Sequence, residues 1–230
     1  MKTARRQGIV TRVALVALGA AAWASLSGCY AGALIESYKR SSTKTVSAEY
    51  TRLEGKSFAV VVAADRAIQA DHPLLTDHIT SRVTERLSAG TNVPVAGGFV
   101  PAPMVLKYMY NTPGWSTASR VELAKALGGE GQTVERIIYI DLYEYRLADP
   151  GNKYEWDGVA AGTVSVYEID STLPEEPAFE RTIQVRFPGK KGIGPEQMDR
   201  VSVTSALALR FVDRASWLFY SHEEPYYPEY

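Results

Sequence analysis

The chain has 230 residues, with 25 basic and 26 acidic side chains and a formal net charge of −1 at pH 7. This near-neutral balance argues against a nucleic-acid-binding protein, which needs a basic face, so we expect no nucleic-acid partner. Cys29 is the single cysteine, which excludes a disulfide within the chain.

Residues 1–28 show the three-part pattern of a secretory signal. Four basic and no acidic side chains stand in the first twelve residues, and an apolar run from Val13 to Leu26 follows. This run is shorter than the roughly 20 residues that a transmembrane helix needs, which disfavours a permanent signal anchor. Removal of residues 1–28 would leave 21 basic against 26 acidic side chains, which predicts a mildly acidic mature protein.

The segment Leu26-Ser27-Gly28-Cys29 resembles the lipobox of bacterial lipoproteins. The resemblance implies cleavage before Cys29 and acylation of its thiol and often of its new amine, so the first expected partner is a lipid bilayer. Tyr30 follows the cysteine, where an Asp would retain the protein at the inner membrane by the Gram-negative sorting rule. The resemblance therefore implies the outer membrane, on its periplasmic face.

The rest of the chain divides into three parts. Residues 29–55 are polar and rich in Ser and Thr, and we interpret them as the lipidated N-terminus and a flexible tether. Residues 56–221 are expected to form a single domain, and residues 222–230 a tail rich in Tyr, Pro and Glu.

Apolar periodicity predicts the elements of this domain. The continuous apolar run 58–63 indicates a strand buried on both faces. Helices are expected from Asp71-His72-Pro73 to Gly90, over about 117–127 and over about 195–220, with a shorter one over 101–110. In the last long helix, spacings of three and four place these residues on one expected core face: Val201, Ser205, Ala208, Val212, Ala215 and Phe219.

Three later segments, 137–145, 159–169 and 179–187, alternate between apolar and polar residues. A period of two over such lengths is typical of half-buried antiparallel strands. The residues that we expect in the core are Ile138, Ile140, Leu142, Val164, Val166, Ile183 and Val185.

This order of elements indicates an α/β fold of the α+β type. We expect a two-layer sandwich in which a mixed, mostly antiparallel sheet carries helices on one face. The order resembles that of small periplasmic α/β domains, such as those of the Tol–Pal translocation protein and of the lipoproteins of curli secretion and peptidoglycan-synthase activation. The resemblance is topological and transfers no functional residue.

The candidate binding surface is a tyrosine-rich face of the sheet. By alternation, Asp141 shares a face with Tyr139, Tyr143 and Tyr145, and Tyr167 lies on the neighbouring strand. Strands disfavour Asp, so we expect a tyrosine hydroxyl or a ligand to hold Asp141. Trp217 is a second, separate candidate, because it falls on the charged side of the last helix, where an exposed Trp is often an interface anchor.

The repeated Asp-His pairs, Asp71-His72 and Asp77-His78, are the most enzyme-like feature, and we interpret them as residues of a helix start. On one helix, residues six apart are separated by roughly 120°, so the two histidines are not expected to bind a metal together. We expect no metal, no cofactor and no catalytic residue.

The function that we favour from the sequence is a non-catalytic envelope lipoprotein. It would bind an envelope protein or cell-wall component in assembly or maintenance of the cell envelope. Two alternatives stay open: an envelope hydrolase that uses Asp141 or the Asp71/His72 region, and a structural subunit that forms a homo-oligomer.

Overall fold

The computed structural model describes residues 42–89, 93, 98–129, 133–152, 154–189 and 193–226. The predicted signal segment and Cys29 lie outside these residues, as does Gly90, the predicted helix end. The described residues fall into two units. The smaller contains most of a two-stranded ribbon of β1 (Thr43–Val46) and β6 (His222–Pro225), and the larger covers residues 46–222.

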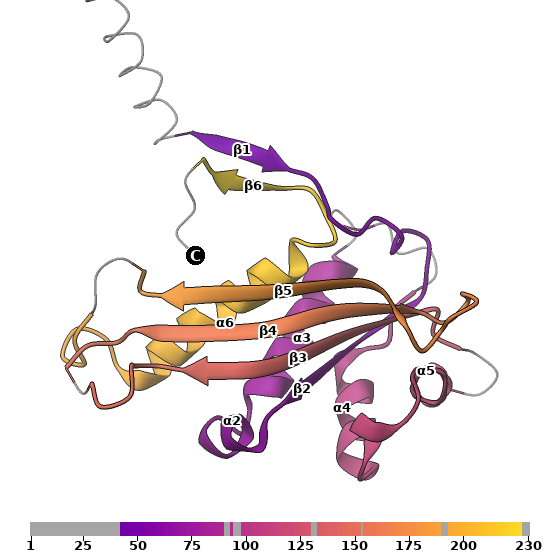
Figure 1. Ribbon diagram of the computed structural model, residues 1–230, viewed down its shortest axis with the longest axis horizontal. Helices are drawn as coiled ribbons and strands as arrows, with labels where there is room; N and C mark the ends of the chain where they lie inside the picture. The colour runs from indigo at the N-terminus through magenta and orange to yellow at the C-terminus, as the bar shows by residue number, and fades with distance from the viewer. Residues whose placement is uncertain are drawn as a thin grey trace, which may run out of the picture. The chain divides into compact units, whose positions relative to one another are not determined.

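The larger unit is built on a four-stranded open sheet in the order β2-β3-β4-β5 (Figure 1). Strand β2 (Phe58–Ala64) is parallel to β3 (Arg136–Arg146), and the remaining pairs are antiparallel. Strands β4 (Gly158–Glu168) and β5 (Pro177–Phe187) complete it. The predicted α+β fold with a mixed sheet is therefore confirmed.

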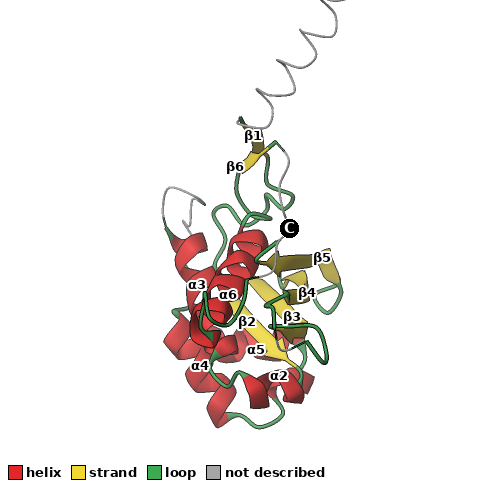
Figure 2. Cartoon of the chain, turned by 90° about the vertical axis from the view of Figure 1, so that its left-hand side faces the viewer, coloured by secondary structure: helices red, strands yellow, loops and turns green. Residues whose placement is uncertain are grey.

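Two long helices cover the inner face of this sheet, α3 (Leu75–Ser88) and α6 (Arg200–Ser216) (Figure 2). All seven predicted core residues of the sheet are buried beneath them, which confirms the period-two analysis. Gly162 of β4 is required there, because a Cβ would lie 3.0 Å from the ring of Phe211 on α6 and 2.8 Å from the carbonyl oxygen of Asp141. Among the described residues, no helix has the length and hydropathy to cross a membrane.

Part of the outer face is covered as well, beyond the single helical layer that we expected. Helices α4 (Ala102–Asn111) and α5 (Arg120–Gly128) pack there against Ala59, Val61 and Ile137, forming a second, smaller core. A short 3-10 helix, Trp115–Thr117, connects them. Helix α5 begins with the capping box that Ser119 and Glu122 form, since each side chain accepts a bond from the other's backbone N–H.

The helix that we expected to open at Asp71 begins later, as α3, at Leu75. Asp71 is instead the last residue of a separate short helix, α2 (Arg66–Asp71). Neither Asp71 nor His72 is therefore the N-cap, although Asp77 does lie in the first turn of α3. The proline at position 73 stands in the connection between the two helices, where it needs no backbone N–H partner.

Residues 47–57, most of which we expected in the tether, belong to the larger unit. Tyr50 and Leu53 are 3% and 1% exposed in the main core. The Tyr50 hydroxyl donates to the buried carboxylate of Glu168 at 2.9 Å, and the Arg52 guanidinium pairs with the same group. The Ser/Thr-rich composition concealed these contacts, because the two apolar residues are too few to show a period.

The buried end of β5 gives a direct test of this fold. Val185 is 1% exposed, so Val185→Asp is expected to lower the free energy of unfolding by roughly 3–5 kcal/mol, because the carboxylate would be buried without a partner. Its neighbour Gln184 is exposed on the same strand, and Gln184→Asp should change stability by about 0.5 kcal/mol or less. Equal urea midpoints for the two variants would show that β5 is placed wrongly.

Candidate binding groove between α3 and α6

A bulge in β3 divides the predicted tyrosine face. Leu142 pairs with Gly162 and Glu144 with Ala161, so Tyr143 has no opposite residue on β4. One extra residue reverses the alternation of everything that follows it. Tyr145 consequently lies on the inner face, only 7% exposed in the main core, and the prediction that it shares a face with Tyr139 is wrong.

Tyr139 and Tyr167 remain together on the outer face, but Arg120 of α5 lies against both rings. Its guanidinium carbon is 4.1 Å from the ring centroid of Tyr139 and 4.9 Å from that of Tyr167. The Glu175 carboxylate in turn accepts the backbone N–H of Arg120 at 2.8 Å, at the start of α5. This hydrogen bond is the main cause that lowers the pKa of the Glu175 carboxyl. This tyrosine pair therefore fastens α5 to the sheet.

Asp141 and Tyr143 are the exposed members of the predicted set. Partial burial, followed by the negative charge of Asp65, raises the pKa of the Asp141 carboxyl. Its side chain makes no hydrogen bond within the described ranges, so the expected tyrosine partner for this carboxylate is not found there.

Trp217 is half-buried at the C-terminal end of α6. Its ring stacks on the imidazole of His222 with centroids 4.5 Å apart and planes inclined by 6°, and it also packs against the main core. One of its faces is thus already occupied within the chain.

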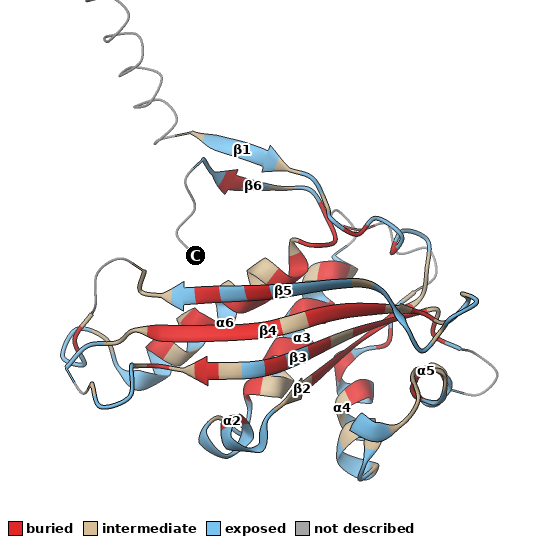
Figure 3. Ribbon diagram, viewed as in Figure 1, coloured by how far each residue is buried: buried red, intermediate tan, exposed pale blue. Residues whose placement is uncertain are grey.

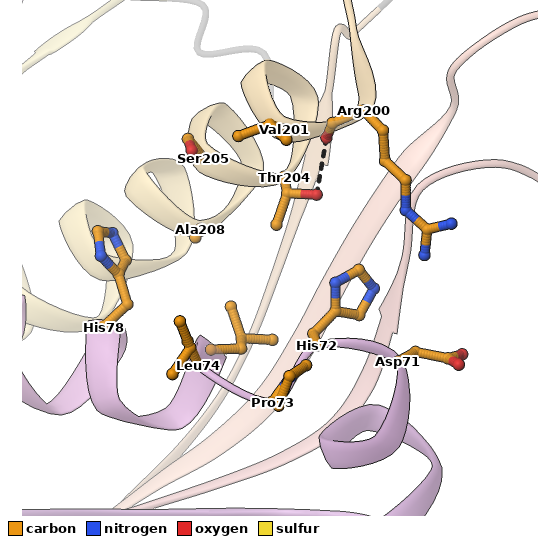
Figure 4. A pocket seen from close by; sticks show the side chains of 11 residues that line it. Asp71, His72, Pro73, Leu74, His78, Arg200, Val201, Thr204, Ser205 and Ala208 are labelled. Atoms are coloured by element: carbon orange, nitrogen blue, oxygen red, sulfur yellow. Dashed lines mark hydrogen bonds between the residues drawn. The ribbon is translucent and has the colours of Figure 1, made fainter.

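A hollowed surface lies elsewhere, between α3 and α6, and we call it the α3–α6 groove. It consists of two adjoining hollows of about 390 and 650 Å³ that share His78 and Ser205. Figure 4 shows the first hollow, with residues of the α2–α3 connection facing the start of α6. The second continues along α3 past Arg82 and Arg86 and along α6 to Leu209.

Large apolar side chains stand exposed on both sides of this groove. Leu74 is 72% exposed, Val201 75% and Leu209 44%. Four of the six residues that we expected on the core face of the last helix are buried, namely Ala208, Val212, Ala215 and Phe219. The other two, Val201 and Ser205, are exposed and line the groove, while α6 also buries Val203, Leu207 and Phe211.

Tyr145 contacts residues of both walls of the first hollow, one in α6 and one in the α2–α3 connection. Its hydroxyl donates to the backbone carbonyl of Thr204 at 2.7 Å, and its ring meets the imidazole of His72 edge-on at 4.8 Å between centroids. Burial, followed by the positive charge of Arg200, lowers the pKa of His72. Burial, followed by Arg82, also lowers that of His78, so both rings are neutral at neutral pH.

Arg200 supplies the available positive charge at the mouth of the first hollow. Within the part of the chain that the structure describes, its guanidinium makes no hydrogen bond or ion pair. By contrast, Arg82 pairs with Glu85 at 2.8 Å and Arg86 with Asp213 at 2.7 Å. The groove therefore offers an apolar strip with one unpaired cation at its end, which suits an apolar segment that carries an acidic group.

The Asp71-His72 pair lines this hollow without the geometry of a catalytic pair. A catalytic imidazole is usually oriented by a carboxylate that accepts its N–H. In Figure 4 the Asp71 carboxylate extends away from the His72 ring, and no hydrogen bond joins the two side chains in the described residues. The described ranges also hold no cluster of three or more His, Cys, Asp or Glu side chains placed to bind a metal ion.

No family model and no curated protein sequence matches this chain. Structural neighbours include bacterial lipoproteins. Lipoprotein GNA1162 from Neisseria meningitidis aligns with a TM-score of 0.42 at 11% identity, over 70% of this chain and 98% of its own. PelC from Paraburkholderia phytofirmans, solved as a dodecamer, aligns with a TM-score of 0.41 at 11% identity, over 78% of this chain and 98% of its own. Such scores assign neither a family nor a function.

The electrostatics of the groove can be measured at His72. Arg200→Gln is expected to raise the pKa of His72, because a neighbouring positive charge disfavours the imidazolium. The pKa should stay below its usual 6.5, since burial is the larger cause and persists. NMR titration of the ring protons checks this, with Arg82→Gln as the control that moves His78 alone.

The same burial sets the sign of a pH effect on folding. The unfolded chain takes up the proton of His72 more readily than the folded one, so stability falls as the pH drops below about 6.5.

The titration of Arg200→Gln also has a contrary outcome. If the pKa of His72 did not move in this variant, the Arg200 guanidinium would not face the imidazole ring.

Proposed function

We propose that this chain is an envelope lipoprotein. The observation that carries this proposal is the segment Leu26-Ser27-Gly28-Cys29 at the end of a charged and then apolar N-terminus. Cys29 would carry the acyl chains after removal of residues 1–28, and Tyr30 favours the outer membrane with the domain in the periplasm. Two acyl chains supply an anchor that one alone does not, at about 0.8 kcal/mol for each buried methylene.

The folded domain, in this proposal, binds an envelope partner and performs no reaction on it. The α3–α6 groove supports this, because Leu74, Val201 and Leu209 expose apolar surface on its two sides with Arg200 beside them. Apolar strips between paired helices with flanking charges are typical sites for a partner's apolar segment. The partner would be an envelope protein that presents such a segment with an acidic residue, and its binding would serve assembly or maintenance of the envelope.

The raised pKa of Asp141 favours one alternative, an envelope hydrolase with this carboxylate as general base. A base must reach the proton that it removes, and a hollow must hold the substrate beside it. Asp141 lines neither hollow of the groove. Binding at the groove is therefore the better supported function.

Lipidation is tested by Cys29→Ser in cells that are fed a labelled fatty acid. We expect the label to be lost and the protein to accumulate uncleaved or unanchored, because the acyl acceptor is the thiol. Ser27→Ala keeps a small residue at the cleavage motif and should retain the label. Equal labelling of Cys29→Ser and the parent chain would refute the lipoprotein proposal.

Partner binding is tested by placing a photo-crosslinking amino acid at Leu209 or Val201 in the full chain. Adducts are expected at these positions but not at Leu173, an apolar residue in a loop outside the groove whose exposure (58%) lies between those of Leu209 and Val201. Adding Arg200→Glu should weaken binding by at least about thirtyfold if this residue is an anchor. Adducts of equal yield at Leu173, or insensitive to Arg200→Glu, would contradict binding in the groove.

A further inference from the structure

Strand β5 forms one edge of the sheet and, among the described residues, has a strand neighbour on one side only. It is 11 residues long, and Figure 3 shows exposed residues along most of its length. A long open edge presents a row of backbone N–H and C=O groups to which another strand can pair. The pattern of its side chains indicates which strand that is.

Arg210 of α6 identifies the backbone groups that face the open edge. Its Nη1 donates to the carbonyl oxygen of Arg186 at 2.6 Å, while its guanidinium carbon lies 5.0 Å from the ring centroid of Phe187. Successive residues of a strand direct their backbone groups to opposite edges. The even-numbered residues from 180 to 186 therefore present their N–H and C=O groups outwards.

These even-numbered residues are self-complementary in one antiparallel register. With Ile183 opposite its own copy, Glu180 lies opposite Arg186 and Thr182 lies opposite Gln184. Each pair occurs twice, so two opposite-charge pairs and two hydrogen-bonding pairs form on the outer face. Direct cross-strand pairs of this kind stabilise antiparallel strands.

The neighbouring registers that use the same edge groups lose this match. Glu180 then lies opposite Gln184, or Arg186 lies opposite Thr182, and no charge is paired. The present contacts of the two charged residues are weak: Glu180 accepts from Ser165 at 3.4 Å, and Arg186 lies 3.9 Å from Asp157. Both side chains are thus available to a second copy.

We propose that β5 pairs antiparallel with β5 of a second copy, about a twofold axis at Ile183, to form one continuous eight-stranded sheet. The charge complementarity between Glu180 and Arg186 selects the second copy as the occupant of this edge, and a twofold axis uses both pairs. In the single copy Arg210 occupies the carbonyl oxygen of Arg186, and this hydrogen bond must break when the two strands pair. This inference goes beyond the proposed function and does not depend on the lipid anchor.

Cysteine crosslinking in intact cells tests the register. Two full-length chains with different tags are coexpressed, one with Thr182→Cys and the other with Gln184→Cys, and mildly oxidised. We expect the mixed disulfide to exceed the Thr182→Cys self-disulfide, because residues 182 and 184 lie opposite each other. Parent chains control for the native Cys29, and Leu173→Cys controls for random collisions at an exposed loop. A mixed yield no higher than that of Leu173→Cys, or a larger self-disulfide, overturns the proposal.

Charge reversal tests the pairing itself. In the crosslinking pair, Glu180→Arg or Arg186→Glu alone should lower the mixed yield by about tenfold, since both charge pairs become like-charge pairs. The double variant Glu180→Arg/Arg186→Glu should restore it. Both residues are exposed, so melting temperatures should stay unchanged and report that the domain remains folded. Failure of the double variant to recover would contradict the proposed pairing.

Discussion

The bulge at Tyr143 is the constraint on which the candidate site depends. By adding one residue to β3, it places Tyr145 on the face of the sheet that α3 and α6 cover. There the Tyr145 hydroxyl forms a hydrogen bond with the backbone of α6 and the ring packs against His72, so one side chain contacts both walls of the first hollow. Without the extra residue, Tyr145 would stand on the outer face and the two walls would lose their common support.

The sequence predicts the sheet well because burial there depends on a period of two. Val164, Val166, Ile183 and Val185 alternate with polar residues, and each proved to be buried. A bulge adds a residue without changing this local pattern, since tyrosine suits both a half-wet face and a core. Tyr139 therefore lies on the predicted outer face, whereas Tyr145, which follows the bulge, lies on the inner face.

The groove was harder to foresee, because it depends on which helices become neighbours. In α6 the spacing of Val201 and Ser205 continued the expected core face of Ala208, Val212 and Ala215, but only the last three are buried. The core also takes Val203, Leu207 and Phe211, whose larger side chains are the signal that could have shown this. The later start of α3 leaves His72 and Pro73 in the wall of the first hollow, and the spacing of apolar residues did not predict it.

The most direct test of this account is the surroundings of Tyr145 in solution. Nuclear Overhauser contacts can be measured between its ring protons and those of His72 and Tyr143, with the tyrosine rings selectively labelled. We expect strong contacts between Tyr145 and His72, whose ring centroids lie 4.8 Å apart, and none between Tyr145 and Tyr143, which the bulge places on opposite faces of the sheet. Contacts between the two tyrosines without any to His72 would mean that β3 has no bulge and that the groove is not built as described.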